Sequence, residues 1–271
     1  PSTVVLSDGS IVLTGGFAAY GEKNDTWRST DNGFTWTLMN ESSGWRARWF
    51  HSLVALPDGS IVLFGGRDNV PHYFNDVWRS TDMGATWTQV TPAADWTARY
   101  GQSGLTIADG SIVLAGGYAS GNVNDTWRSM DKGATWTQIN TSAGWVARSD
   151  ATCVVVADGT IVLAGGLDYS GNVRNDTWRS TDNGNTWTQM KASSGWPART
   201  YHASVALPNG SILIMGGSNS STYLNDVWTF NTAGSTVQHP SHSYITPGSY
   251  TTILTAYNSF GSDTKRKIGY I

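Results

Sequence analysis

The sequence predicts an all-β fold built from five copies of one unit. Glycine and tryptophan, with 31 and 14 copies among 271 residues, are abundant. Glu and Lys, which are frequent in soluble helical proteins, occur only twice and five times. A Gly-Gly pair recurs at steps of 50, 51, 49 and 51 residues, beginning at Gly15, Gly65, Gly116, Gly165 and Gly216. A composition poor in helix formers and a regular period together favour a repeated β-sheet.

Each unit begins with a predicted hairpin. An apolar run precedes every Gly-Gly pair and starts directly after Asp-Gly or Asn-Gly, as in Asp58-Gly59 followed by residues 60–64. Asp-Gly between two β-rich runs is the strongest short signal for a tight hairpin. The residues on either side of this turn are therefore the first and second strands of each unit.

The second half of each unit supplies two more strands. Asn-Asp-(Thr/Val)-Trp, as in residues 75–78, marks the third strand, and Thr-Trp-Thr, as in residues 86–88, begins the fourth. The fourth strand leads to Trp-x-Ala-Arg, which ends at Arg48, Arg99, Arg148 and Arg199. Four short antiparallel strands in about 50 residues are typical of a β-propeller blade. The predicted propeller covers residues 1–235, in units of about 1–47, 48–98, 99–147, 148–198 and 199–235.

These motifs resemble the kelch repeat. Arg-x-x-His at residues 48–51 and 199–202, then Asp-Gly, Gly-Gly and a later Trp, follow the kelch pattern. Two units depart from it, because Gln102 and Ala151 stand where the histidine is expected. The resemblance extends over residues 1–230 and implies a propeller whose periodic arginines brace neighbouring blades.

The turn between the third and fourth strands resembles the Asp-box of bacterial neuraminidase repeats. It reads Ser-x-Asp-x-Gly-x-Thr-Trp in the first four units. The carboxylate can accept N–H groups of the turn, and the glycine allows a positive φ. We interpret the four aspartates as structural: Asp31, Asp82, Asp131 and Asp182.

The chain beyond Trp228 has neither this turn nor another tryptophan. Residues 236–271 resemble the second half of a PKD domain, an immunoglobulin-like module of cell-surface proteins. Half of such a sandwich leaves open strand edges. These strands complete the last blade, form a sixth, or pair with another chain by self-association, and the sequence leaves the three alternatives open.

Non-periodic residues gather in the loops between the second and third strands, which share one propeller face with the crossings between units. Aromatic rings beside Asp, Asn and Arg are typical of a glycan-binding rim, because sugars stack their apolar faces on rings. The alternative is that these tyrosines only cover blade edges. The candidate ligand-binding residues are Tyr20, Arg67, Asp68, His72, Tyr73, Tyr118, Asp168, Tyr169 and Tyr223.

No convincing catalytic set emerges, so we expect a protein without enzymatic activity. Asp68 and Asp168 hold the same place in two units, and two unrelated loop aspartates explain them better than a paired-carboxylate hydrolase does. Cys153 lies in an apolar run, which favours a buried thiol over a nucleophile. We expect no metal or other cofactor, with calcium at the Asp-rich turns left open.

Charge and sequence signals restrict partners and location. A net charge of -3 argues against nucleic-acid binding, and no apolar run approaches the length of about 20 residues that a membrane span needs. The chain begins with Pro1 rather than Met, so we expect that an upstream segment was removed. Asn40 and Asn140 lie in Asn-x-Ser sequences and are candidate glycosylation sites.

Together these features predict an extracellular or cell-surface protein of a microbe. Our first hypothesis is a binding or adhesion module that recognises glycans or surface proteins through its loop face. The alternatives are a structural subunit of a surface layer or filament, and a sialidase-like glycoside hydrolase.

Overall fold

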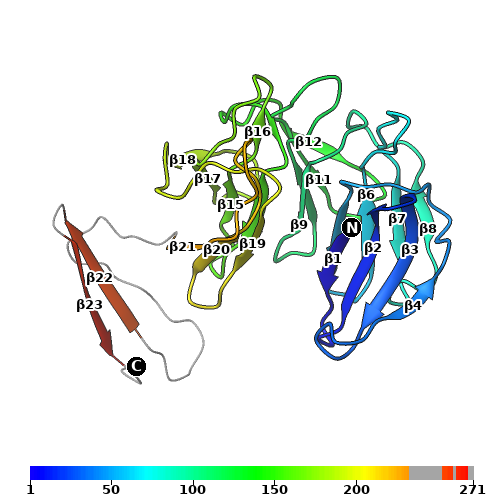
Figure 1. The fold of residues 1–271 in the computed structure, drawn as a ribbon, viewed down its shortest axis with the longest axis horizontal. Coiled ribbons are helices and arrows are strands. Elements are labelled where there is room, and N and C mark those ends of the chain that lie inside the picture. The colour runs from blue at the N-terminus through cyan, green and yellow to red at the C-terminus, as the bar shows by residue number, and fades with distance from the viewer. Residues whose placement is uncertain (232–251, 259–260, 268–271) are drawn as a thin grey trace. The chain divides into compact units, whose positions relative to one another are not determined.

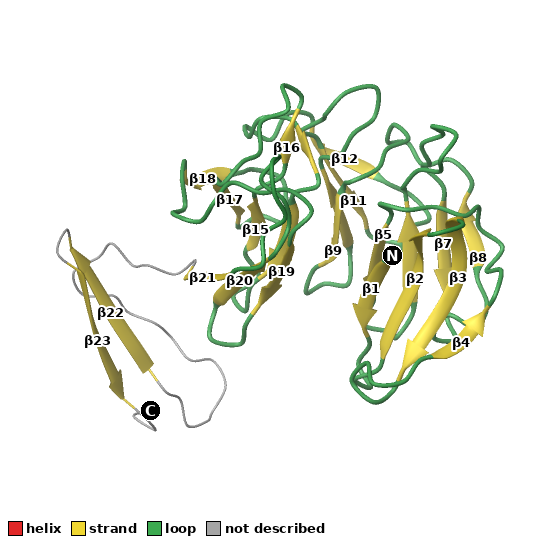
Figure 2. Ribbon diagram, in the orientation of Figure 1, coloured by secondary structure: helices red, strands yellow, loops and turns green. Residues whose placement is uncertain are grey.

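The structure, a computed structural model, describes residues 1–231, 252–258 and 261–267. The chain divides into two compact units, Pro1–Ala233 and Gly234–Ile271, whereas the sequence placed the boundary after residue 235. Every regular element among the described residues is a strand (Figure 2). The all-β prediction is therefore confirmed.

The described residues of the first unit form five larger antiparallel sheets, one for each sequence repeat, and one short two-stranded sheet. The first sheet consists of β1 (Ser2–Val5), β2 (Ile11–Ala18), β3 (Gly21–Ser29) and β4 (Thr37–Asn40). The second consists of β5 (Ser52–Ala55), β6 (Ile61–Phe64), β7 (Val77–Ser80) and β8 (Thr88–Thr91). The third consists of β9 (Ser103–Thr106), β10 (Ile112–Ala115), β11 (Thr126–Ser129) and β12 (Thr137–Asn140).

The last two repeats differ slightly from this pattern. The fourth sheet consists of β14 (Thr152–Val155), β15 (Ile161–Ala164), β17 (Thr177–Ser180) and β18 (Thr188–Lys191). A short pair, β13 (Arg148–Ser149) and β16 (Leu167–Asp168), lies beside it in the chain. The fifth sheet has β19 (Ala203–Ala206), β20 (Ser211–Met215) and β21 (Val227–Asn231). Any fourth strand of this sheet that follows β21 falls on residues outside the described part.

The five sheets of the first unit stand side by side in chain order, as blades of a propeller (Figure 1). The first strand of each blade contacts the first strand of the next, from β1 through β5, β9 and β14 to β19. These first strands therefore form the inner wall of the propeller, and the predicted β-propeller fold is confirmed.

Apolar side chains of successive blades form the layers between them. Val62 and Phe64 of the second blade pack in one cluster with Ile112 and Leu114 of the third. The tryptophan of each Trp-x-Ala-Arg motif is buried at such a junction, at Trp45, Trp96, Trp145 and Trp196. Because strand residues alternate between two faces, each blade can contribute one face to each of two junctions. The repeat is thus stabilised by its neighbours rather than within one blade.

A bidentate ion pair accompanies each crossing from one blade to the next. The Arg148 guanidinium is fully buried and donates to both carboxylate oxygens of Asp176, at 2.6 and 2.9 Å. Three further pairs repeat this arrangement: Arg48–Asp76, Arg99–Asp125 and Arg199–Asp226. The arginine of the kelch-like motif thus ties the crossing to the third strand of the blade that it enters.

The turn that resembles the Asp-box is held by its own aspartate. Asp131 accepts hydrogen bonds from the backbone N–H and the hydroxyl of Thr135, at 2.8 and 2.6 Å, and from the Ser129 hydroxyl. Gly133 in this turn has a φ of 94°, and an added Cβ would lie 2.7 Å from Val77 of the preceding blade. These contacts explain the residue types of the turn, while its kinship with neuraminidase repeats stays a prediction.

Cys153 lies on β14 and is partly buried, where the sequence predicted a buried thiol. Cys153 packs with Leu105, Val113 and Ile161, and burial raises the pKa of its thiol to about 12. A thiol in this environment is protonated at neutral pH and is a poor nucleophile.

The second unit shows one antiparallel hairpin, β22 (Thr252–Asn258) and β23 (Gly261–Lys267). Residues 232–251 and the side chains of the hairpin lie outside the described part. The PKD-like assignment of this region therefore stays a prediction. Among the described residues, none lies in a helix long and apolar enough to cross a membrane.

Candidate functional site

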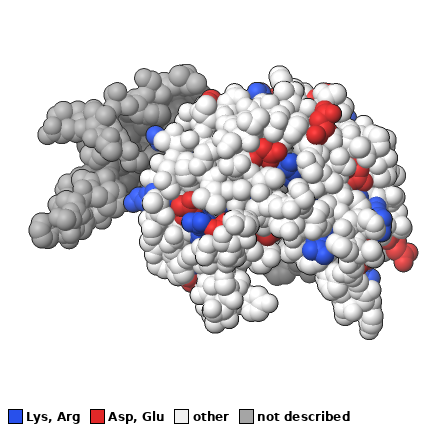
Figure 3. All heavy atoms as spheres, turned by 90° about the horizontal axis from the view of Figure 1, so that it is seen from above, with Lys and Arg blue, Asp and Glu red and all other residues white. Residues whose placement is uncertain are grey.

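The loop face of the propeller is built where the crossings between blades pair with the loops that follow each Gly-Gly. Isolated bridges join Trp49 to Arg67 and Tyr100 to Tyr118, and β13 with β16 is the same connection in the fourth repeat. Two loops distant in sequence are therefore held together at the same end of each blade. Figure 3 views the molecule from the end where β16 lies, and charges of both signs are scattered over that face.

The second residue after each buried arginine sits over the inner wall in a left-handed backbone conformation. Phe50, Gly101, Asp150 and Tyr201 occupy this position, with φ of 54°, 62°, 54° and 56°. Backbone hydrogen bonds connect three of them, from the Gly101 N–H to the Phe50 carbonyl and from the Asp150 N–H to the Gly101 carbonyl. Bulky residues adopt a positive φ at a cost of about 1 kcal/mol or more, and such strain is concentrated at functional sites.

Aromatic rings from three crossings and their partner loops form a continuous group, which we call the channel-mouth cluster. Its members are Phe17, Trp49, Phe50, Tyr73, Tyr100, Tyr118 and Tyr201. Phe50 is central, because its ring stacks on Trp49, Tyr100 and Tyr201 with centroid separations of 4.4, 5.9 and 5.4 Å. The stack of Phe50 on Tyr201 joins the crossing into the second blade with the crossing into the fifth.

A cation already lies on this cluster. The Arg67 guanidinium is 5.1 Å from the ring centroids of both Trp49 and Tyr100, and it donates to the Asp68 carbonyl. Guanidinium groups at this distance are attracted by the negative face of the ring. The cluster therefore combines broad apolar faces with a positive group at its rim.

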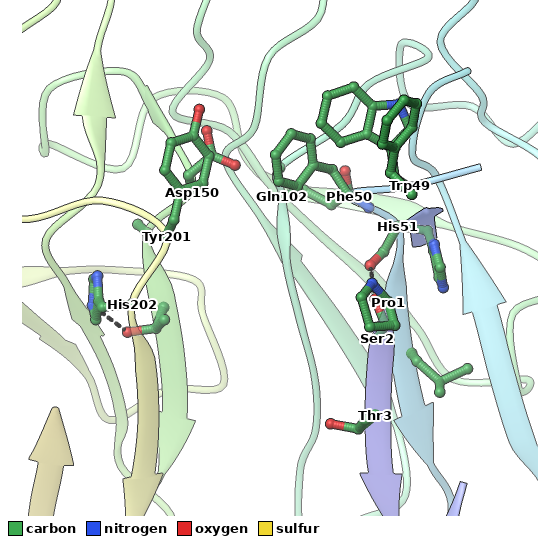
Figure 4. Close-up of a pocket in the computed structure, with 15 residues that line it drawn as sticks. Pro1, Ser2, Thr3, Trp49, Phe50, His51, Gln102, Asp150, Tyr201 and His202 are labelled. Carbon is green, nitrogen blue, oxygen red and sulfur yellow. Dashed lines mark hydrogen bonds between the residues drawn. The ribbon is translucent and has the colours of Figure 1, made fainter. Parts of the chain in front are cut away.

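A cavity of about 620 Å³ opens between the channel-mouth cluster and the first strand of the propeller. Figure 4 shows Asp150, Tyr201 and His202 along one side, with His51 and Pro1 along the other. This volume lies in the range of small-molecule binding sites. Apolar rings together with a few polar groups give the wall the usual composition of such a site.

Asp150 is the acidic side chain of this wall. One carboxylate oxygen accepts from the Ser149 hydroxyl at 2.9 Å, and no described side chain or N–H donates to the other. Desolvation raises the pKa of Asp150 to about 6, although the hydrogen bond from Ser149 favours the ionised form. Burial raises the pKa of Tyr201 to about 12, and the nearby Asp150 carboxylate adds to this shift.

The two histidines of the kelch-like motif lie deeper in the same wall. His51 and His202 each place Nε2 at 2.9 Å from a threonine hydroxyl, on Thr14 and Thr152. Burial lowers the pKa of His202 to about 4 and that of His51 well below its usual value. Both rings are therefore neutral at pH 7. The His51 ring joins the crossing into the second blade to β2, and the His202 ring joins the crossing into the fifth blade to β14.

The structure brings together three of the residues that the sequence proposed as ligand-binding. Arg67, Tyr73 and Tyr118 all belong to or lie on the channel-mouth cluster. Tyr20, Tyr169 and Tyr223 are almost fully exposed, and no ring contact joins them to the cluster in the described part of the chain. All six residues stay predictions as ligand contacts. Their geometry favours Arg67, Tyr73 and Tyr118, because these three lie at the channel-mouth cluster.

The two candidate carboxylates have local partners. Asp68 is buried and accepts from the His72 backbone N–H and from Arg46. Asp168 is buried as well, and it holds its loop by accepting from Asn172 and Arg174. Their side chains organise loops, and neither carboxylate lines the cavity.

The glycosylation candidates have engaged amides. The Asn40 amide nitrogen, to which a glycan would be attached, donates to the Ala85 carbonyl of the next blade at 2.8 Å. Asn140 makes the equivalent bond to Asn185. Modification of either asparagine would replace a contact between blades.

The periodic arginines and the acidic groups offer little to an enzyme of the sialidase type. All four arginines are bound by aspartates, so no free arginine cluster faces the channel in the described residues. No group of three or more His, Cys, Asp or Glu side chains there is arranged to hold a metal ion.

Sequence reasoning missed Phe50, Tyr100, Asp150 and Tyr201. A signal was present, because the positions directly after Trp-x-Ala-Arg vary between repeats while the motif before them is periodic. Trp49 is a further sign, since Tyr100, Ser149 and Thr200 stand at its place in the other repeats. In the sequence the crossings are short connections between units, and nothing in one crossing indicates that its side chains meet those of another.

Two family models match the sequence. The model of the KLHDC2/KLHL20/DRC7 Kelch-repeats domain matches residues 2–166, which is more than half of the chain. The model of the DUF6242 beta propeller domain matches residues 102–237. A search of curated proteins finds no significant match. The two matched regions overlap and together span the five blades.

Proposed function

Because the chain belongs to the Kelch-repeats domain family, we propose that it is a binding module that takes its partner on the loop face. Kelch-type propellers are usually interaction scaffolds without enzymatic activity. The partners that we propose are glycans or surface proteins, outside the cell or on its surface. The observation that carries this proposal is the channel-mouth cluster.

The cluster has the properties of an interaction centre. Its rings are held by one another, so little side-chain freedom is lost when a partner covers them. Tyr201 and Phe17 are each about half exposed, at 52% and 53%, and offer apolar faces to solvent. Aromatic and arginine side chains dominate binding energy at protein interfaces, and flat rings also stack on sugars.

The test is a glycan and cell-surface binding assay with two matched pairs of variants. Tyr73→Ala and Tyr118→Ala remove rings of the cluster, whereas Tyr169→Ala and Tyr223→Ala remove exposed tyrosines outside it. We expect the first pair to weaken binding about tenfold or more and the second to leave it unchanged. Equal effects of both pairs, or the absence of any glycan or surface partner, would remove the basis of the proposal.

A second candidate function is self-association into a layer or filament. Val227 on β21 is 63% exposed, although the equivalent Val77, Thr126 and Thr177 are buried against the next blade. A second copy that packs on Val227 would bury it, as neighbouring blades bury the equivalent residues within the chain. Sedimentation at high protein concentration tests this function, and a monomer at all concentrations for both wild type and Val227→Asp would exclude it.

A further inference from the structure

The cavity at the channel mouth joins an incompletely bonded carboxylate to aromatic faces. Asp150 is the only acidic side chain among the described residues that line the cavity, and none of those residues is Lys or Arg. One of its oxygens is bound by Ser149 alone, and the other has no donor in the described part of the chain. A partly buried carboxylate without a positive partner gains most from a cationic ligand.

The backbone is arranged to place this carboxylate in the wall. Asp150 has a left-handed conformation, and its carboxylate lies against Gly101 of the preceding crossing. A Cβ on Gly101 would lie 2.5 Å from Oδ1 of Asp150, so only glycine leaves room for the carboxylate there. The residue types of two successive crossings are therefore matched to each other.

The aromatic part of the wall suits a cation as well. Phe50 and Tyr201 line the cavity, and their rings stack at 5.4 Å with planes only 13° apart. Ring faces attract Lys, Arg and quaternary ammonium groups, and the attraction is stronger where water is excluded. Arg67 shows that this cluster accepts a cation on ring faces, although Arg67 itself does not line the cavity.

The geometry points to an ammonium-binding site, in which the Asp150 carboxylate pairs with an organic ammonium group that lies against Phe50 and Tyr201. This inference rests on the proposed function, because it names the chemistry that the loop face recognises. A calcium ion fits less well, since it needs about six to eight oxygen ligands and this wall has one carboxylate. The ammonium group can belong to a free amine or to a lysine side chain of a protein.

The ionisation of Asp150 makes binding dependent on pH. Its pKa of about 6 means that the carboxylate is largely ionised at pH 7 and largely protonated at pH 5. The groups nearest to it are Ser149, Tyr201 and Tyr100, and Arg67 acts on both tyrosines. His51 and His202 line the cavity but stay neutral over this range, and the Pro1 N-terminal amine, whose pKa burial lowers, lines it on the side of His51. Affinity for a permanent cation should therefore rise with pH through about 6 and then level off.

The experiment measures calorimetric binding of choline to the full chain, with 3,3-dimethylbutan-1-ol as the neutral compound of the same shape. We expect choline to bind and the alcohol to bind at least about tenfold more weakly. Asp150→Asn should reduce choline affinity about tenfold and remove its pH dependence. Phe50→Leu should reduce it about threefold or more, and Asp95→Asn, which changes an exposed carboxylate away from the cavity, should have no effect.

Two further arms separate the possible sources and the possible failures. Binding of Nα-acetyl-lysine methylamide, lost on Nε-acetylation, would assign the ammonium group to a protein partner, while binding of choline alone would assign it to a free amine. Equal binding of choline and the alcohol, or choline binding that survives Asp150→Asn and is independent of pH, would overturn the inference. In that case the binding assay with Tyr73→Ala and Tyr118→Ala still decides the proposed function separately.

Discussion

The buried ion pairs between crossings and blades allow a direct test of how burial sets their contribution to stability. Asp176 and Asp226 make the same three contacts, with two guanidinium nitrogens of an arginine and with the indole N–H of a tryptophan. Their side chains differ in exposure, at 10% for Asp176 and 33% for Asp226. The substitution of Asn for Asp therefore removes the same charge at both positions, once from a buried carboxylate and once from a more exposed one.

The expected cost follows from the contacts. An amide has only one acceptor oxygen, so the NH₂ group of an asparagine faces at least one of the three donors. The buried arginine also keeps its charge without a counter-ion. Removal of one partner from a buried pair costs about 3–5 kcal/mol, and we expect Asp176→Asn to lose about 3 kcal/mol of unfolding free energy. Asp226→Asn should lose clearly less, because the side chain of Asp226 is 33% exposed and solvent screens its pair with Arg199.

The assay is urea denaturation at pH 7, followed by tryptophan fluorescence and circular dichroism. Hydrogen bonds and the arginine charge outweigh burial and lower the pKa of Asp176 below its unfolded value. Stability from this group is therefore present above about pH 4 and lost as pH falls through the folded pKa, so the difference between wild type and Asp176→Asn should shrink in acid. Equal losses for the two variants at pH 7 would refute the argument from burial.

Two further predictions concern the channel mouth. Gly101→Ala should destabilise the protein by about 1–3 kcal/mol in urea denaturation and abolish choline binding, because the new methyl group meets the Asp150 carboxylate at a positive φ. Gly121→Ala, where an added Cβ meets no atom within 4 Å, is its control and should cost less than the expected loss at Gly101. Asp150→Asn should raise the unfolding free energy at pH 7 by about 1–2 kcal/mol. The raised pKa of Asp150 means that its ionisation destabilises the folded protein as pH rises from about 4 to about 6, and asparagine does not ionise. An Asp150→Asn variant that is less stable than wild type at pH 7, or a gain in unfolding free energy that persists at pH 4, would contradict the expected direction.

Much of the fold could be read from local patterns. Asp58-Gly59 predicted a hairpin, and the structure has Gly59 at a φ of 82° between β5 and β6. The tight turn requires that conformation whatever surrounds it, so the signal is local. The same holds for the turn around Asp131, where hydrogen bonds span only four residues.

The site was less accessible to the same reasoning. Phe50 and Tyr201 are 151 positions apart in the chain, yet their rings stack. Both hold the second position after a buried arginine, but Gly101 and Asp150 fill that position in the repeats between them, so the residue types show no pattern that indicates the contact. Loop tyrosines such as Tyr20 and Tyr169 looked equivalent to Tyr73 in composition, and only the packing of neighbouring loops separates them.

Short-range patterns thus specified the repeat, its four strands and the residues of its turns, because hairpins, caps and strand alternation depend on neighbours in the chain. Tertiary structure decided which side chains meet at the channel mouth. The curvature of the row of blades brings the crossing into the second blade and the crossing into the fifth blade together, and that curvature is a property of the packed blades. The carboxylate of Asp150 acquires its raised pKa and its aromatic surroundings only there.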